Sequence, residues 1–311
     1  MTDRSITIFG GSGFVGRYVV QRLARRGWTI RVAVRRPDRA LFLKPLGQVG
    51  QITPVMANIR DDASVGAALA GADAAVNLVG ILYRQGRQTF DAVHVEGARR
   101  VARAARAAGA TRLVQMSALG ADPQSPSDYA RSKAAGEAAV REAFPAATIV
   151  RPSIVFGPED DFFNRFAGMA RLLPALPLVG GGRTRFQPVY VGDVANAFDR
   201  ILETPETAGR TYELGGPAVH SFRELMEILL RQIGRKRLLL PLPFFAASIQ
   251  AGLFELLPVP PPLTRDQVRL LRQDNVVDPA VPGLSALGIE PTALAAILPT
   301  YLTRYRRAGR A

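Results

Sequence analysis

The stretch Gly10-Gly11-Ser12-Gly13-Phe14-Val15-Gly16 lies between a short apolar run at residues 6–9 and an amphipathic segment that ends at Arg26. The order is strand, glycine turn and helix, which is more specific than an ordinary glycine-rich turn. Glycines at positions 10, 13 and 16 allow a tight turn, a close approach of backbone amides to a pyrophosphate, and close packing of the helix. The helix N-terminus adds unpaired N–H groups and a positive dipole end. We therefore expect a dinucleotide-binding turn whose ligand contacts come from Gly10, Ser12, Gly13, Phe14, Val15 and Gly16.

The composition limits the class of protein. A chain of 311 residues with 48% hydrophobic content is long enough for one large α/β domain and a smaller appendage. Cysteine is absent, which excludes disulfides and thiolate zinc sites. The two histidines, His94 and His220, have no second histidine at ligand spacing. We predict no metal site and no Ser/His/Asp triad.

The formal net charge of +14 favours acidic partners, anionic lipid surfaces or nucleic acid. The arginines are spread over many predicted helices without interleaved aromatic residues, and no nucleic-acid module is recognisable. We therefore expect no nucleic-acid partner. The N-terminus lacks the basic-then-apolar order of a signal peptide, so the expected location is the cytoplasm of a bacterium.

Apolar, β-branched segments alternate with helical segments over the first half of the chain. Predicted strands follow the first at residues 29–34, 51–56, 74–79, 112–116 and 147–150. Predicted helices lie between them at residues 61–71, 90–108 and 129–144. Such alternation indicates right-handed βαβ units. The expected fold class is α/β, a Rossmann-type doubly wound parallel sheet with helices on both faces.

Proline and glycine become frequent after Pro152, which indicates a smaller, discontinuous C-terminal lobe interleaved with the last strands of the sheet. We place the nucleotide-binding domain at residues 1–152 and the smaller lobe, with its basic tail, at residues 153–311.

The segment at residues 238–262 is rich in Leu, Phe and Pro and follows Arg235-Lys236-Arg237. Its polar residues and prolines argue against a membrane-spanning helix. Two interpretations stay open: the core of the second lobe, or a surface that meets anionic lipid or a hydrophobic partner.

The form of the nicotinamide cofactor is predicted from the end of the second strand. An acidic residue there accepts a hydrogen bond from the ribose 2′-OH of NAD, whereas arginine receives the 2′-phosphate of NADP. This chain reads Val34-Arg35-Arg36-Pro37, with Arg17 as a third candidate. We expect NADP(H), the alternative being that Arg35 and Arg36 are simply solvated.

Further cofactor contacts follow from position in the βαβ series. The adenine is expected after the third strand, and the ribose and pyrophosphate over the residues that follow the fourth. The end of the sixth strand is a further candidate. The residues are Asn58, Ile59, Leu78, Val79, Gly80 and Pro152.

Tyr129 and Lys133 are four residues apart on a predicted helix and share one face. An ammonium there can reach the cofactor ribose and lower the pKa of the phenol enough for acid/base work. Lys133 is one of three lysines in a chain that otherwise uses arginine. The third member of such a site is a hydroxyl after the fifth strand: either Ser117 serves, or the position holds Ala118 and the triad is broken. We favour the broken triad.

Several segments together resemble the atypical short-chain dehydrogenase/reductases that serve as accessory subunits of respiratory complex I, NADH:ubiquinone oxidoreductase. The likeness runs over residues 6–216 and rests on GGSGFVGR (10–17), NLVGILY (77–83), TFDAVHVEGARRV (89–101), SALGAD (117–122), YARSKAAGE (129–137), RPSIVFGPEDDFFNRFA (151–167) and GGGRTRFQPVYVGDVA (180–195).

The resemblance implies a tightly held NADPH that is not turned over. It also implies a structural or assembly role near the junction of the peripheral and membrane arms. The expected partners are other complex I subunits, with peripheral contact to anionic lipids at the cytoplasmic face of the bacterial inner membrane. Tyr129, Lys133 and Ser117 would then be vestigial.

The competing interpretation is an active NADP(H)-dependent reductase, epimerase or isomerase, in which Tyr129 is the acid/base, Lys133 tunes it and Ser117 polarises the substrate. A weaker alternative is a redox sensor that reports NADPH by changing its binding partners.

Overall fold

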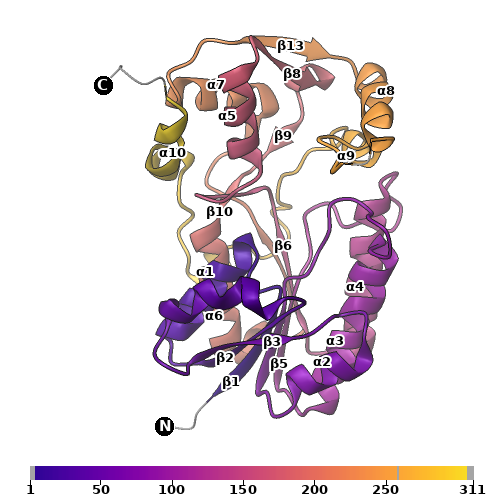
Figure 1. Ribbon diagram of the computed structural model, residues 1–311, viewed down its shortest axis with the longest axis vertical. Helices are drawn as coiled ribbons and strands as arrows, with labels where there is room; N and C mark the ends of the chain where they lie inside the picture. The colour runs from indigo at the N-terminus through magenta and orange to yellow at the C-terminus, as the bar shows by residue number, and fades with distance from the viewer. Residues whose placement is uncertain (1–3, 258, 307–311) are drawn as a thin grey trace.

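The computed structural model describes residues 4–257 and 259–306, and its centre is a seven-stranded sheet (Figure 1). All neighbouring strands are parallel, in the order β11-β6-β5-β4-β1-β2-β3. This confirms the predicted doubly wound α/β fold. The strands are β1 (Ser5–Phe9), β2 (Thr29–Val34), β3 (Ile52–Met56), β4 (Ala74–Asn77), β5 (Arg112–Met116), β6 (Thr148–Pro152) and β11 (Thr211–Leu214).

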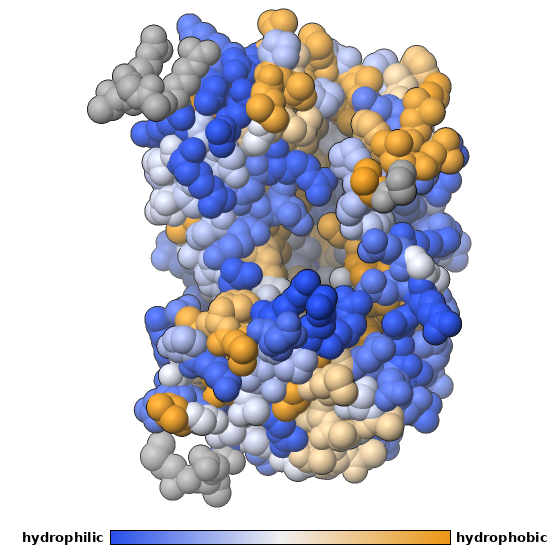
Figure 2. Space-filling model, in the orientation of Figure 1, coloured by the Kyte–Doolittle hydropathy of each residue, from blue (hydrophilic) through white to orange (hydrophobic). Residues whose placement is uncertain are grey.

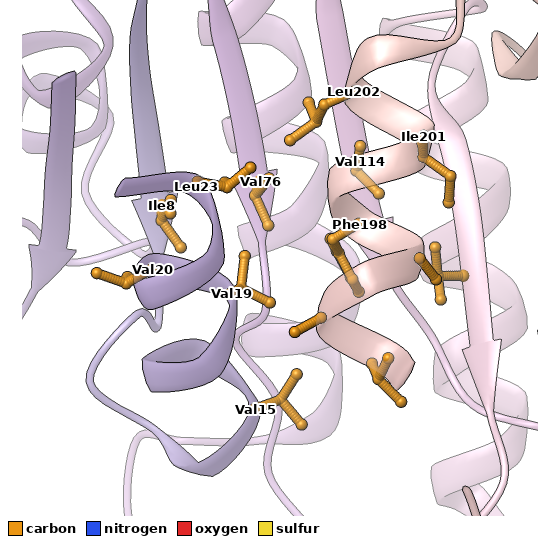
Figure 3. Packing of buried hydrophobic residues seen from close by; sticks show 14 of the residues in the cluster. Ile8, Val15, Val19, Val20, Leu23, Val76, Val114, Phe198, Ile201 and Leu202 are labelled. Carbon is orange, nitrogen blue, oxygen red and sulfur yellow. The ribbon is translucent and has the colours of Figure 1, made fainter. Parts of the chain in front are cut away.

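Helices cover both faces of the sheet (Figure 1). One face carries α1 (Phe14–Arg25) and α6 (Val191–Glu203), and the other carries α2 (Asp62–Leu69), α3 (Glu96–Ala107) and α4 (Asp128–Ala143). Figure 3 shows the apolar contact between α1 and α6 over the sheet. It is made by Val15, Val19, Val20, Leu23, Phe198, Ile201 and Leu202, with Ile8, Val76 and Val114 from the strands below.

The second lobe is discontinuous. The chain leaves the sheet after β6, returns to it with α6 and β11, and leaves again (Figure 1). The division predicted at residue 152 remains a prediction. The lobe contains β7 (Val155–Phe156), α5 (Phe162–Leu172), β8 (Ala175–Val179), β9 (Arg185–Phe186), β10 (Val189–Tyr190), β12 (His220–Ser221), α7 (Phe222–Gln232), β13 (Leu238–Leu242), α8 (Phe244–Glu255), α9 (Arg265–Leu270) and α10 (Leu294–Leu302).

Short helical turns connect these elements. Five have 3-10 geometry, at Pro37–Leu46, Gly180–Gly182, Pro205–Thr207, Ser285–Leu287 and Thr303–Tyr305. In residues 4–257 and 259–306, no helix has the length and apolarity needed to cross a membrane.

One predicted helix has an irregular start, and one predicted strand boundary was wrong. The helix expected at residues 90–108 spans residues 91–107 and starts as a π-helical turn, Asp91–Val95, before α3. The wider turn lies where α4 comes close, since a Cβ on Gly136 would overlap the carbonyl oxygen of His94. The fourth strand ends two residues early because the side-chain oxygen of Asn77 accepts a hydrogen bond from the Val79 N–H, which starts the turn.

Candidate dinucleotide site

A groove of about 650 Å³ opens at the carboxyl ends of β1 to β4. The sheet order reverses between β1 and β4, and such a switch point is where ligands bind in open α/β sheets. The groove brings together most of the predicted cofactor residues. Its lining includes Gly10, Ser12, Gly13, Arg35, Arg36, Asn58, Ile59, Leu78, Val79 and Gly80.

The glycine turn has the geometry that its sequence predicts. Gly10 has a positive φ of 78°, and a Cβ there would lie 3.3 Å from the backbone of Leu78. Gly13 donates its N–H to the Gly10 carbonyl at 3.0 Å. A Cβ on Gly16 would come within 2.6 Å of the Gly11 Cα, so this glycine lets the helix pack on the turn.

Seven of the predicted contacts are not among the lining residues of the groove; three of them, Arg17, Tyr129 and Lys133, are described below. Val15 is buried in the α1 core, and Phe14 meets the ring of Tyr18 edge-on. Gly16 lies behind the turn, and Pro152 is buried at the end of β6, where its carbonyl accepts from the Leu119 N–H. Whether these residues touch a cofactor remains a prediction.

Arginines gather at the end of the groove beside β2 and β3. Arg35 donates from Nη1 to the side-chain oxygen of Gln88 at 2.9 Å, whereas Arg36 has no ion pair among the described residues. Arg39 and Arg60 also line the groove, and the sequence analysis missed both. Arg60 could have been found because it directly follows the predicted adenine residues.

Arg17 points elsewhere. Its Nη1 lies 3.3 Å from Glu159 Oε1, and its guanidinium carbon lies 5.1 Å from the ring centre of Phe42. It is not among the lining residues of the groove. Its role as a third phosphate ligand remains a prediction.

Tyr129 and Lys133 come from the first turns of α4. The Lys133 Nζ lies 5.8 Å from the ring centre of Tyr129 and 3.4 Å from where a Cβ on Gly80 would stand, at the edge of the groove. Burial lowers the pKa of Lys133 to about 8, against an opposing effect of Glu137. Burial raises the pKa of Tyr129 to about 12. The predicted lowering of the phenol pKa by the ammonium is therefore wrong in this structure, because desolvation dominates.

The Ser117 hydroxyl is buried and has no hydrogen-bond partner within residues 4–257 and 259–306. It therefore makes no hydrogen bond with Tyr129 or Lys133. The next residue, Ala118, is partly exposed. This arrangement agrees with the interpretation in which Ala118 occupies the position of the hydroxyl.

His94 connects several residues at this end of the groove, and its sequence context gave it no role in a metal site or a triad. Its Nε2 accepts from the Ile81 N–H at 3.0 Å, which leaves Nδ1 to donate to the Ser132 hydroxyl at 2.9 Å. Its ring stacks on Phe90 and meets the Tyr129 ring edge-on. Burial, together with the charge of Lys133, lowers the His94 pKa to about 3, so the ring is neutral.

Asp266 of α9 caps α4 from a distant part of the chain. Its carboxylate accepts hydrogen bonds from the Ser127 hydroxyl at 2.8 Å, the Asp128 N–H at 2.8 Å and the Tyr129 N–H at 3.0 Å. A negative charge at a helix N-terminus is stabilising. The second lobe thus fixes the first turn of α4, which carries Tyr129. No local sequence pattern predicts this contact between α9 and α4.

The model of the NAD dependent epimerase/dehydratase family matches residues 6–215. The chain belongs to this family. The ligand class of its groove is accordingly a nicotinamide adenine dinucleotide, in one of its two forms.

The relatives include proteins named as complex I subunits and proteins named as reductases. A mitochondrial "NADH dehydrogenase [ubiquinone] 1 alpha subcomplex subunit 9" from Arabidopsis thaliana is 37% identical over 97% of this chain and 78% of its own length. The subunit of the same name from Mus musculus is 37% identical over 93% of this chain and 77% of its own. A "Ceramide reductase" from Caulobacter vibrioides is 36% identical over 64% of this chain and 61% of its own.

Solved structures support the fold. The NADPH-dependent quinone oxidoreductase of Escherichia coli in complex with NADPH superposes with a TM-score of 0.74, at 21% identity, over 96% of this chain and 99% of the other.

Proposed function

We propose that the chain is an NADP(H)-binding, non-catalytic accessory subunit of a respiratory complex I, near the junction of its peripheral and membrane arms. The observation that carries this proposal is the 37% identity, over 97% of this chain, to a subunit that bears the complex I name. The partners are then other subunits of that complex.

The residues of the groove fit NADP(H) better than NAD(H). Arg35, Arg36 and Arg39 stand where an acidic residue would accept from a ribose 2′-OH. Arg36 has no carboxylate partner in the described part of the chain, so its charge is available to a 2′-phosphate. The turn from Gly10 to Gly13 would hold the pyrophosphate, Asn58 and Ile59 the adenine, and Lys133 the nicotinamide ribose.

The geometry beside the nicotinamide end supports retention without turnover. A reduced nicotinamide supplies a hydride, and reduction of a carbonyl also needs a proton donor and a group that polarises the oxygen. The Ser117 hydroxyl is buried with no hydrogen-bond partner among the residues that the structure describes, and burial makes the Tyr129 phenolate harder to form. The hydroxyl, phenol and ammonium are therefore not assembled into one hydrogen-bonded set.

The location proposed is peripheral, at the cytoplasmic face of a bacterial inner membrane, with contact to anionic lipids. The net charge of +14 supports it, because an anionic leaflet attracts basic surfaces.

Native electrophoresis of detergent-extracted membranes tests the accessory role. We expect the chain to migrate with the band that has NADH dehydrogenase activity. A chain that migrates alone, while that band stays active and complete, would contradict the proposal.

The second candidate is an active NADP(H)-dependent reductase, and the relative named ceramide reductase favours it. Tyr129 would donate the proton, Lys133 would adjust the pKa of the Tyr129 phenol, and Ser117 would polarise the substrate. The purified chain should then oxidise NADPH when a lipid extract is added, and Tyr129→Phe should abolish this oxidation. An accessory subunit shows no such oxidation in either form.

A further inference from the structure

The helix α8 packs with its small residues inward and its large apolar residues outward. Its buried side is made by Ala247, Ala251 and Gly252. Its outward side and the two leucines that follow the helix are here called the α8 face, which consists of Phe245, Ile249, Leu253, Leu256 and Leu257; the first four are between 61% and 81% exposed. A surface helix of a soluble protein normally shows the opposite arrangement, because burial of large apolar side chains is what holds it in place.

Phe244 and Phe245 have different roles, although they are adjacent. Phe244 is partly buried: its ring fills the space beside Gly180, and the Arg272 guanidinium carbon lies 4.7 Å from the ring centre. Phe245 is 69% exposed. Of the two interpretations of residues 238–262, the core interpretation therefore fits Phe244 and the surface interpretation fits Phe245.

The apolar surface extends beyond the helix. Figure 2 shows hydrophobic surface over α8 and also over the end of the lobe where β13 lies. Leu238 and Leu240 of β13 are 66% and 52% exposed. Exposed apolar surface gathered at one end of a lobe is typical of an interaction site.

Guanidinium groups lie beside the start of α8. Arg272 lies over Phe244, and the exposed Arg183 follows the Gly180 turn that Phe244 contacts. Arg265 lies against Gly252 on the inner side of the helix. Its charge is offset by Glu255, whose Oε2 lies 3.9 Å from the Arg265 Nε and whose Oε1 accepts a hydrogen bond from the Arg265 backbone N–H at 2.8 Å. The positive charge at this border therefore comes from Arg183 and Arg272.

We propose that the α8 face inserts into the headgroup region of an anionic bilayer, with Arg183 and Arg272 against lipid phosphates. Large apolar side chains on one side of a helix with basic groups beside them are what an interfacial helix requires. Charge complementarity selects a lipid surface over a second copy of this chain, because two copies would bring equally basic rims together. The inference deepens the proposed membrane-side location and rests on it.

Vesicle binding by the intact, nucleotide-loaded chain tests the proposal without complex I. We expect co-sedimentation with vesicles of 70% phosphatidylcholine and 30% phosphatidylglycerol at low salt, and weaker binding as salt rises. Ile249→Gln with Leu253→Gln should weaken binding by about tenfold for each side chain and leave the melting temperature unchanged. Leu41→Gln with Val49→Gln is the matched control, since both residues are exposed on the first lobe.

Phe245→Trp supplies a second readout that does not depend on removing apolar surface. The native tryptophan, Trp28, is buried in the first lobe, so a change in emission on adding vesicles reports position 245. We expect a blue shift and quenching by lipids brominated on their acyl chains.

Three results would overturn the inference. These are no binding of the unaltered chain at low salt, equal binding of the glutamine pair and the unaltered chain, or equal binding to pure phosphatidylcholine. Loss of complex I association in the glutamine pair without vesicle binding by the unaltered chain would assign the face to a protein partner instead. Failure of the accessory role alone would leave the vesicle results unchanged, so the two failures are distinguishable.

Discussion

Arg36 is the side chain on which the preference for NADP(H) depends most directly. The Arg35 guanidinium donates a hydrogen bond to the side chain of Gln88. Arg36 lines the groove and makes no such side-chain hydrogen bond within the described ranges. Arg36→Asp should reduce the NADPH-over-NADH affinity ratio by about tenfold to a hundredfold, because a charged hydrogen bond contributes ~1.5–3 kcal/mol. Arg35→Asp should reduce it less. Calorimetric titration measures both ratios, with Arg25→Asp on α1 as the control; equal affinities in the unaltered chain would refute the assignment.

Lys133 should make NADPH binding sensitive to pH. Its pKa is lowered to about 8 by burial, and the complex favours the ammonium, so affinity should fall as pH rises above about 8. The slope should approach about tenfold per pH unit. Titrations between pH 7 and 9.5 should show this slope in the unaltered chain and in Lys44→Met, and a flatter one in Lys133→Met. The same profile in all three proteins would remove Lys133 from the site.

His94 should make folding stability sensitive to acid. Burial lowers its pKa to about 3 in the folded chain, below the ordinary 6.5. The unfolded chain therefore takes up a proton first, and stability present above pH 6.5 is lost as pH falls toward 3, by up to about 1.4 kcal/mol per pH unit. Urea unfolding between pH 7.5 and 4.5 should show a shallower loss in His94→Gln. His220→Gln replaces the other histidine as a control, and a slope that His94→Gln does not change would contradict the buried neutral ring.

Among the elements, α4 depends on a cap that comes from α9. Asp266→Ala removes an acceptor shared by the Ser127 hydroxyl and two backbone N–H groups. We expect a loss of about 1–3 kcal/mol in the free energy of unfolding, since the α4 terminus is left without its charged acceptor. Asp62→Ala, which removes an exposed ion pair with Arg100, should cost at most about 1 kcal/mol. Equal losses of unfolding free energy in the two variants would show that the Asp266 cap stabilises the chain no more than an exposed ion pair does.

The order of strands and helices could be predicted because each element carries its own pattern: β-branched runs for β1 and β2, and the glycine turn before α1. The arginines after β2 were also readable, since they are local to one loop. Asp266 could not be found, because its partners in α4 are 137–139 residues away. The inverted packing of α8 was equally hidden, since composition does not say which side of an apolar helix faces the protein.

At the scale of the whole molecule, the first lobe holds the nucleotide groove and the second lobe holds the α8 face (Figure 1). The two lobes are connected through α9, because the Asp266 carboxylate accepts a hydrogen bond from the Tyr129 N–H in the first turn of α4. If the chain is a non-catalytic subunit, a bound nucleotide stabilises the fold that presents the α8 face.

We propose that the chain holds NADP(H) without turning it over as part of complex I. The rate of NADH:ubiquinone oxidoreduction and the NADP(H) content, both measured in the complex isolated from cells that carry Tyr129→Phe, test this proposal. We expect an assembled complex with an unchanged rate and unchanged NADP(H) content, because this substitution removes only the acid/base proton. An assembled complex that keeps its nucleotide but loses its rate would contradict the proposal and favour an active reductase.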